Sequence, residues 1–304
     1  MAGTPTFAVP AGFMGLGHNP NAAITIAGIP HDTGTTNRSG ARFGPHAIRH
    51  ASRMLVDGEH PSQFVDPMAL SLSDAGDFTI ALGDIAATFA LIEAQAAGHA
   101  HLITLGGEHG ISLPLLRALT KRRGGPVALV HFDAHVDTWP DNFGQPLGHG
   151  SPFYHAINEG LIDAHRSIQI GIRSPVQREV WDWTLAAGMT VLTAQAVHEM
   201  GVAAVAAEIL RVVGNAAAYL TFDIDALDPA FAPGTGTPEI GGLASWQVQA
   251  ILRRLGPIDF VGMDMVEVAP AYDHAEITAL AAATVVWEYL ALHGSRAVPP
   301  LSSR

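Results

Sequence analysis

Residues 127–137 read Val-Ala-Leu-Val-His-Phe-Asp-Ala-His-Val-Asp, an apolar run that ends in polar side chains. Short runs rich in aliphatic and β-branched residues are typical of strands that are buried on both faces. Similar runs recur along the chain, which predicts eight strands. They span residues 23–29, 69–74, 101–105, 127–133, 167–172, 189–193, 217–224 and 257–266.

The segments between these runs carry Ala and Leu at helical spacing, for example at 84–98, 111–122, 175–187, 201–213, 244–255 and 275–292. Alternating strands and helices predict an α/β protein with a parallel sheet covered by helices. Periodicity alone leaves two architectures open, a three-layer sandwich and a closed barrel. In either one, ligands bind at the carboxyl ends of the strands.

The chain has 304 residues, of which 48% are hydrophobic and 14% charged, a balance typical of a compact globular protein. An α/β chain of this length can form one continuous core, and we find no internal repeat and no linker. We therefore expect a single domain over residues 1–304. The Gly- and Pro-rich residues 1–22 and the tail 294–304 are expected to be irregular.

The net charge of -12 argues against nucleic-acid and anionic-membrane partners, because both require clustered Lys and Arg. No apolar run reaches the roughly 18 residues that span a bilayer, and the start lacks a basic segment followed by an apolar one. We expect no membrane partner and a cytoplasmic location. The absence of cysteine excludes disulfides, thiolate zinc sites and a thiolate nucleophile.

Candidate metal ligands stand at the ends of three predicted strands. In the opening stretch, acidic and imidazole side chains recur at a spacing of two, so they would face the same way if the strand stays extended. A second strand repeats this spacing, and a third ends in Gly-Gly followed two residues later by histidine. The six candidates are His109, Asp133, His135, Asp137, Asp223 and Asp225.

Four carboxylates in one buried cavity could not all stay ionised without cations, because like charges raise one another's pKa. Two divalent cations would cancel their charge. Oxygen and imidazole ligands without sulfur suit Mn²⁺ best, with Ni²⁺, Co²⁺, Fe²⁺ or Zn²⁺ as alternatives. The competing interpretation, solvated loop acids or helix caps, suits a lone aspartate better than two matching motifs.

Three blocks of the sequence resemble the signatures of the ureohydrolases, the family of arginase, agmatinase and guanidinobutyrase. These blocks are 106–109, 132–137 and 221–229, and the likeness extends from about residue 24 to 290. The resemblance implies an α/β/α sandwich with a central eight-stranded parallel sheet. It also implies two Mn²⁺ ions, or nickel in some members, held by the same six ligands, and a homo-oligomer that is a trimer or a hexamer.

The resemblance assigns two further residues. His149, in Gly-His-Gly-Ser-Pro, matches the histidine that moves a proton near the leaving amine, and Glu267 matches the glutamate that holds the guanidinium. Without the resemblance, His149 could be a loop histidine and Glu267 a solvated acid at a strand end. The implied reaction is attack of a metal-activated water on a guanidino carbon, which releases urea and an amine.

The chain departs from the family pattern at Glu108 and Gly110, where members usually read Gly-Gly-Asp-His-Ser. Groups next to a ligand tune a metal site, so metal preference or activity could differ. Residues 138–147 do not match the loop with which arginases bind the amino-acid end of arginine. The resemblance is therefore to the agmatinase and guanidinobutyrase branch.

The far end of the substrate is left open by the sequence. An amine tail would favour a carboxylate such as Asp141, and a carboxylate tail would favour a basic side chain. Trp139 and Phe143 could either shape an apolar pocket or pack. The candidates for a carboxylate tail are Arg38, Arg42, His31 and His155.

Three other functions remain as alternatives at this point. The enzyme could act on another guanidine, such as guanidine itself, guanylurea or a biguanide. It could be a weakly active metal-binding subunit of a hetero-oligomer, as the changes at Glu108 and Gly110 suggest. A phosphoester hydrolase is disfavoured, because few Lys or Arg residues stand near the motifs.

Overall fold

Eight parallel strands form one sheet in the computed structural model, which describes residues 12–55 and 58–297. The strand order is β2-β1-β3-β8-β7-β4-β5-β6, so β2 and β6 are the two edges. The strands are β1 (Ile24–Ile29), β2 (Leu72–Asp77), β3 (Leu102–Gly106), β4 (Ala128–Phe132), β5 (Ile168–Ile172), β6 (Thr190–Thr193), β7 (Ala217–Asp223) and β8 (Asp259–Val266). The eight predicted strands are confirmed.

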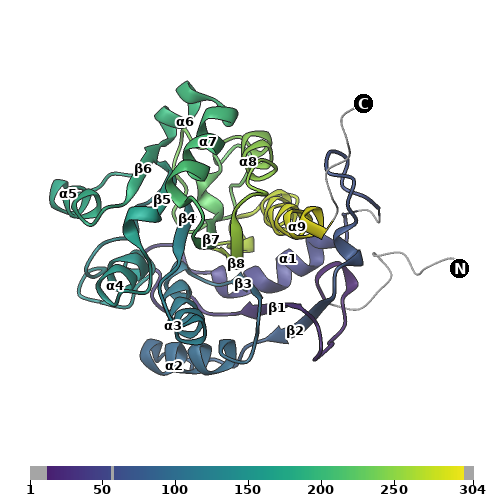
Figure 1. Cartoon of the computed structure of the whole chain (residues 1–304). Coiled ribbons are helices and arrows are strands. Elements are labelled where there is room, and N and C mark those ends of the chain that lie inside the picture. Colours follow the sequence, from purple (N-terminus) through teal and green to yellow (C-terminus); the bar gives the residue numbers. More distant parts are fainter. Residues whose placement is uncertain (1–11, 56–57, 298–304) are drawn as a thin grey trace, which may run out of the picture.

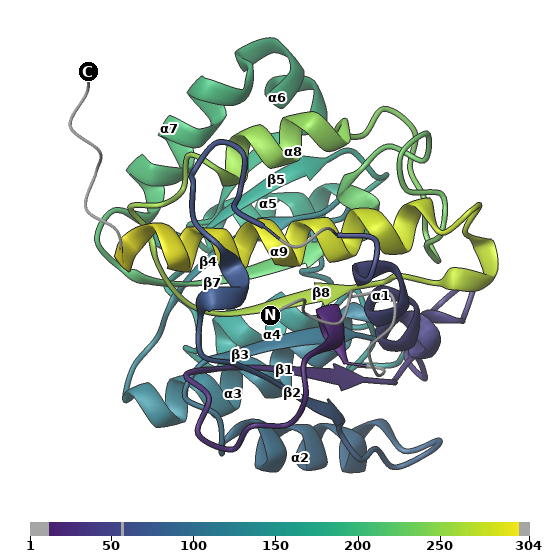
Figure 2. The same cartoon turned by 90° about the vertical axis from the view of Figure 1, so that its right-hand side faces the viewer.

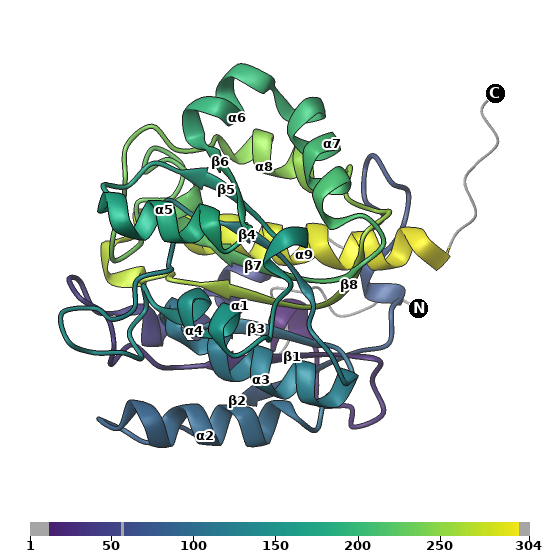
Figure 3. The ribbon, with the colours of Figure 1, turned by 60° about the vertical axis from the view of Figure 1, so that its left-hand side comes forward.

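Helices cover both faces of this sheet (Figures 1 and 3). Helices α2, α3 and α4 lie on one face, and α1 and α6 to α9 lie on the other. The bounds are α1 (Gly44–Ser52), α2 (Ile85–Ala96), α3 (Ser112–Arg123), α4 (Pro152–Asn158), α5 (Arg178–Ala186), α6 (Ala194–Met200), α7 (Val202–Val213), α8 (Ser245–Leu252) and α9 (Ile277–Ala297). The open sheet between two helical layers is the α/β/α sandwich, not the barrel.

The interior strand β4 shows why its sequence is a continuous apolar run. Val130 and Phe132 pack into the core formed with α7, α8 and α9, whereas Leu129 packs into the core formed with α3 and α4. Successive side chains of a strand point to opposite faces, and here both faces are covered. Alternation along β4 therefore also turns His131 toward the α3 and α4 side.

Two boundaries differ from the sequence prediction. Strand β2 begins at Leu72 rather than 69, because residues 67–69 form a short 3-10 helix whose first turn is capped by Asp66, which accepts a hydrogen bond from the Met68 N–H. Helix α9 continues past residue 294 to Ala297. Residues 298–304 of the expected tail lie outside the described part of the chain.

Helix α9 corrects the expectation that no segment has membrane-spanning length. Its residues Ile277–Gly294 are long and apolar enough to cross a bilayer, but 61% of this stretch is buried inside the protein. The helix lies between α8 and α1 across one face of the sheet (Figure 2). Its buried Glu288 is paired with Arg253 and His60. We therefore interpret α9 as a core helix of this fold.

Candidate metal centre

Four adjacent strands at the middle of the sheet, β3, β8, β7 and β4, carry most of the predicted site residues. Because these strands are parallel, their carboxyl ends meet at one edge of the sheet. His109 follows β3, Glu267 follows β8, Asp223 and Asp225 stand at the end of β7, and Asp133, His135 and Asp137 follow β4. His149 comes from the loop between β4 and α4.

Three carboxylates converge on one ring nitrogen of His109. Its Nδ1 lies 2.9 Å from Asp137 Oδ2, 3.0 Å from Asp133 Oδ2 and 3.3 Å from Asp223 Oδ2. All four side chains are buried. This arrangement brings ligands from three strands to one point.

A second histidine completes the cluster. His135 Nδ1 lies 3.1 Å from Asp225 Oδ2 and 3.3 Å from Asp133 Oδ1. Asp133 therefore turns one carboxylate oxygen toward each histidine. The six predicted ligands form one connected cluster with Asp133 at its centre.

Hydrogen bonds on the far side of the His109 ring determine which of its two nitrogens carries the proton. Asp264 is buried and accepts hydrogen bonds from the hydroxyls of Ser112, Tyr219 and Thr221. Since a carboxylate only accepts, the Thr221 hydroxyl must donate to it at 2.5 Å. Thr221 Oγ1 then accepts from His109 Nε2–H at 2.8 Å.

A neutral His109 therefore presents an unprotonated Nδ1 to three carboxylates. Nδ1 is buried and has no well-formed hydrogen bond among the described residues. A lone pair facing three anionic oxygens is unfavourable unless a cation stands between them. The residues thus fit a divalent metal ion, whose ligands must be deprotonated.

The electrostatics of the cluster indicate an excess of buried negative charge. Burial lowers the pKa of His109, but the carboxylates of Asp133, Asp137 and Asp223 that face its ring outweigh burial and raise that pKa well above its ordinary value. Burial and the nearby Asp225 and Asp133 raise the pKa of Asp223 well above its usual range. Divalent cations would relieve both shifts. Oxygen and imidazole donors without sulfur suit Mn²⁺ and other divalent cations.

The chain bends where the sequence analysis had considered an extended strand. Strand β4 ends at Phe132, and residues 134–135 form a bend. Asp137 has a φ of 46° and Glu267 a φ of 64°, values in the left-handed region that non-glycine residues rarely adopt. Asp133, His135 and Asp137 therefore converge through a bent loop and not by strand alternation. Such backbone strain is common at functional sites.

His131 is a site residue that the sequence analysis missed. Gln169 on β5 donates from Nε2 to His131 Nδ1 at 3.1 Å, so His131 Nε2–H donates to Asp133 Oδ2 at 2.7 Å. Ligand atoms of His109, His131 and Asp133 lie within 4.8 Å of one another. Because its Nε2–H is used on Asp133, we interpret His131 as a support for that carboxylate. The spacing of two from Asp133 was the signal that could have found it.

His149 and Glu267 lie beside this cluster and contact each other. His149 Nδ1 is 3.1 Å from Glu267 Oε1, which also accepts the backbone N–H of His109 at 2.9 Å. Burial lowers the pKa of His149, but its hydrogen bond to Glu267 and the nearby acids raise it to about 9. Glu267 Oε2 is buried and has no hydrogen-bond partner among the described residues. One oxygen of Glu267 therefore keeps an unused acceptor position.

A pocket of about 510 Å³ opens above the cluster, a volume within the range of small-molecule sites. Its floor includes His135, Asp137, Asp223 and His149, while the other four predicted site residues lie behind it. No Lys or Arg is among the described residues that line it. Its rim is formed by Trp139, Asp141, Asn142, Phe143, Pro175 and Gln177.

A sandwich with acidic and imidazole side chains gathered below such a pocket fits the class of α/β/α enzymes whose site can hold divalent cations. The sequence pattern of the arginase family matches residues 22–291 of this chain, which supports this class. The chain belongs to the arginase family. It is a ureohydrolase, an enzyme that acts on a carbon–nitrogen bond of a guanidino group.

Relatives and solved structures support this assignment over nearly the whole chain. The agmatinases of Photorhabdus laumondii and Chromobacterium violaceum are 47% and 45% identical, over 92% and 90% of this chain and 90% and 85% of their own lengths. The proclavaminate amidino hydrolase of Streptomyces clavuligerus has a TM-score of 0.91 at 38% identity, covering 96% of this chain and 99% of that one. A hypothetical agmatinase of Burkholderia thailandensis has a TM-score of 0.89 at 44% identity, with coverages of 96% and 93%.

Proposed function

We propose that this protein hydrolyses a small guanidino compound with a cationic tail, such as agmatine, to urea and an amine. The observation that carries the proposal is the free oxygen of Glu267. Its Oε1 accepts from His109 and His149, whereas Oε2 is buried beside the acidic cluster and has no partner within residues 12–55 and 58–297. A guanidinium N–H is a suitable donor for that oxygen.

Two divalent cations would be held side by side. His109, Asp133, Asp137 and Asp223 would hold one, because their ligand atoms converge. His135 and Asp225 would hold the other together with the second oxygen of Asp133. Mn²⁺ is our preferred ion, with Ni²⁺ as the alternative. When bound, such ions lower the pKa of water toward neutrality and stabilise negative charge.

Side chains of this protein would supply orientation and proton transfer. Glu267 would bind the guanidinium through Oε2 and fix the direction of its carbon relative to the cluster. The Nδ1–H of His149 is held by Glu267, which places the imidazole at the floor of the pocket. A histidine in this position can move a proton to the departing amine.

The charge of the rim supports a cationic tail. Asp141 lines the pocket, and one of its oxygens accepts the Gly144 N–H at 2.7 Å. No Lys or Arg is among the described residues that line the pocket. Trp139 and Phe143 stand beside it, and aromatic faces favour cations.

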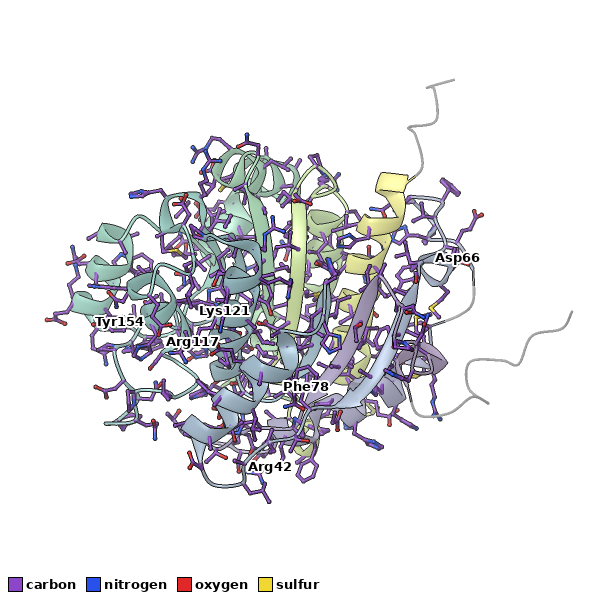
Figure 4. All side chains as sticks on the ribbon, turned by 60° about the horizontal axis from the view of Figure 1, so that its bottom comes forward. Arg42, Asp66, Phe78, Arg117, Lys121 and Tyr154 are labelled. Atoms are coloured by element: carbon purple, nitrogen blue, oxygen red, sulfur yellow. The ribbon has the colours of Figure 1, made fainter. Side chains whose placement is uncertain are left out.

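The basic residues that could have held a carboxylate tail are engaged elsewhere. Arg42 pairs with Asp32 and lies at the protein's lower edge in Figure 4. The guanidinium of Arg38 stacks 4.6 Å over the Tyr272 ring. His155 bonds the Pro146 carbonyl, and His31 is buried. This arrangement favours agmatine over 4-guanidinobutanoate.

The test is urea release from a panel of guanidino compounds by protein loaded with Mn²⁺ or with Ni²⁺. We expect agmatine to be turned over with a kcat/KM at least about 10-fold above that of 4-guanidinobutanoate, the effect of one favourable charge contact. Guanidine, guanylurea and biguanides complete the panel. No urea from any compound would refute the function, and a preference for 4-guanidinobutanoate would refute the role of the rim. Turnover by the purified protein alone would exclude the weakly active subunit.

We also propose that the chain assembles into a trimer or hexamer and acts in the cytoplasm without nucleic-acid or membrane partners. The first point is checked by sedimentation, in which a stable particle of 31.9 kDa would contradict it. The lack of nucleic-acid and membrane partners is expected from the net charge of the chain, which is -12 at pH 7.

A further inference from the structure

The loop between β1 and α1 crosses the carboxyl edge of the sheet and reaches the pocket. Asp32 closes the base of this loop, because it accepts the Gly40 N–H at 2.8 Å and pairs with Arg42. Thr36, between these anchors, lines the pocket together with His149. The loop thus carries a hydroxyl to the floor of the site.

Thr36 makes two contacts with the same ring nitrogen of His149. Its backbone N–H lies 3.2 Å from His149 Nε2, and its Oγ1 lies 2.8 Å from that atom. A backbone amide can only donate, so Nε2 must accept. The neutral ring then carries its proton on Nδ1, which donates to Glu267. Thr36 therefore fixes the direction of the His149 ring and, when the ring is neutral, its tautomer.

The residue before Thr36 is tied to a buried carboxylate. The Thr35 hydroxyl donates to Glu108 Oε2 at 3.2 Å. Glu108 Oε1 lies 3.4 Å from His31 Nε2, and both side chains are fully buried. The His31–Glu108 pair thus anchors the loop from below, one residue before the proposed ligand His109.

Two glycines leave the space that the Glu108 side chain occupies. A Cβ atom added at Gly34 would lie 2.6 Å from Glu108 Oε1, and one added at Gly110 would lie 3.1 Å from it. A larger residue at either position would press on the carboxylate. The structure therefore gives a physical reason for finding glutamate at 108 together with glycine at 110.

We propose that Thr36 is a positioning residue for His149 and that the buried His31–Glu108 pair holds Thr36 in place. The proposal rests on the proposed function in one respect, that His149 takes part in turnover. Without the Thr36 hydroxyl, the ring keeps only the backbone N–H on Nε2 and turns more freely. Without the Glu108 carboxylate, the loop that carries Thr36 loses its anchor.

The experiment measures kcat, KM and metal content for T36V, T36S, E108Q and the double variant T36V/E108Q of the metal-loaded protein. We expect T36V to lower kcat about 10-fold with little change in KM, and T36S to restore it to within about 2-fold, the scale of one hydrogen bond. E108Q should lower kcat by about 3- to 10-fold. If Glu108 acts through Thr36, the double variant should be no slower than T36V, because coupled residues are not additive.

Metal content separates this role from a general loss of structure, since all four variants should keep the metal content of the wild type. Wild-type kcat in T36V, equal losses in T36V and T36S, or losses that multiply in the double variant would overturn the proposal. Crystal structures of the wild type and T36V supply a readout that does not need turnover. A His149 ring held in the same single conformer in both would also overturn it. Absence of urea release from the wild type would instead overturn the proposed function.

Discussion

The floor and the rim of the pocket are built in different ways. The floor and the acidic cluster behind it consist mainly of side chains at the ends of four neighbouring strands, and Asp133, at the centre of that cluster, is fully buried and contacted by three histidines. The rim consists of loop residues, among which Phe143 is 96% exposed. A sheet fixes the atoms that do the chemistry, whereas loops can vary to choose the substrate. We therefore expect floor variants to lose turnover and rim variants to change substrate binding.

The largest effect should come from Asp133, the residue that joins the two halves of the acidic cluster behind the floor. In D133N the amide keeps the size of the side chain but removes the charge that faces both histidines. We expect metal content to fall for both ions and kcat to fall by at least about 10³-fold, the scale of lost metal catalysis. Elemental analysis and a urea assay check this. Retention of both metals with wild-type kcat would show that Asp133 is not the shared ligand.

The next effect concerns His149, which belongs to the floor but is not a proposed ligand. H149N leaves the six ligands and their charge unchanged, so metals should stay bound. We expect kcat to fall by about 10²-fold, as is usual when a proton-transfer group is lost. Metal analysis beside kcat separates the two roles. If this variant loses its metals, His149 is a ligand or a structural support and not a proton-transfer residue.

A smaller effect is expected at Asp141 on the rim. D141N removes the negative charge that would face a cationic tail, so KM for agmatine should rise by about 5- to 10-fold while kcat stays within about 2-fold. In the wild type, salt should raise KM, because it screens the attraction between Asp141 and the cationic tail. In D141N, KM should depend less on salt. E208Q is the matched control, since Glu208 is paired with Arg211 on α7, away from the rim. Equal KM values for the wild type and D141N would exclude Asp141 from tail binding.

The smallest effect should come from the hydrogen bond that ties Trp139 to the start of α5. The Trp139 indole N–H donates to Gln177 Oε1 at 2.6 Å. W139F keeps an aromatic ring but loses this bond, so we expect KM to rise by about 2- to 5-fold with kcat unchanged. Q177L should give the same change, and the double variant should add nothing. Independent, multiplying effects would show that the bond does not organise the rim.

The strands and the meeting of polar side chains at their ends could be predicted, because strand ends have a recognisable sequence pattern. The eight strands and the convergence of His109, Asp133 and Asp225 follow from buried apolar runs that end in polar residues. The same spacing contained His131, which was overlooked because the resemblance assigned no role to it. The bend at residues 134–135 could not be predicted, since it depends on Asp133 accepting the backbone N–H of His135.

The contacts made by the rim and by the loop after β1 could not be predicted from the sequence. Thr36 meets His149 across 113 positions, and nothing in Gly-Thr-Thr-Asn indicates that contact. Asn142 was also missed, although its side chain accepts hydrogen bonds from Gly150 and Ser151 and so fixes the loop that carries Phe143. Such contacts depend on how loops from different strands meet, which local patterns do not encode.

The central claim is that the acidic and histidine side chains at the floor bind two divalent cations that are needed to release urea. The most direct test is to strip the wild-type protein with a chelator and to add Mn²⁺ in steps, following bound metal and urea release from agmatine together. We predict no urea release without metal and activity that reaches its maximum at two ions per chain. Full activity in protein that holds no metal, or a maximum at one ion per chain, would contradict the account.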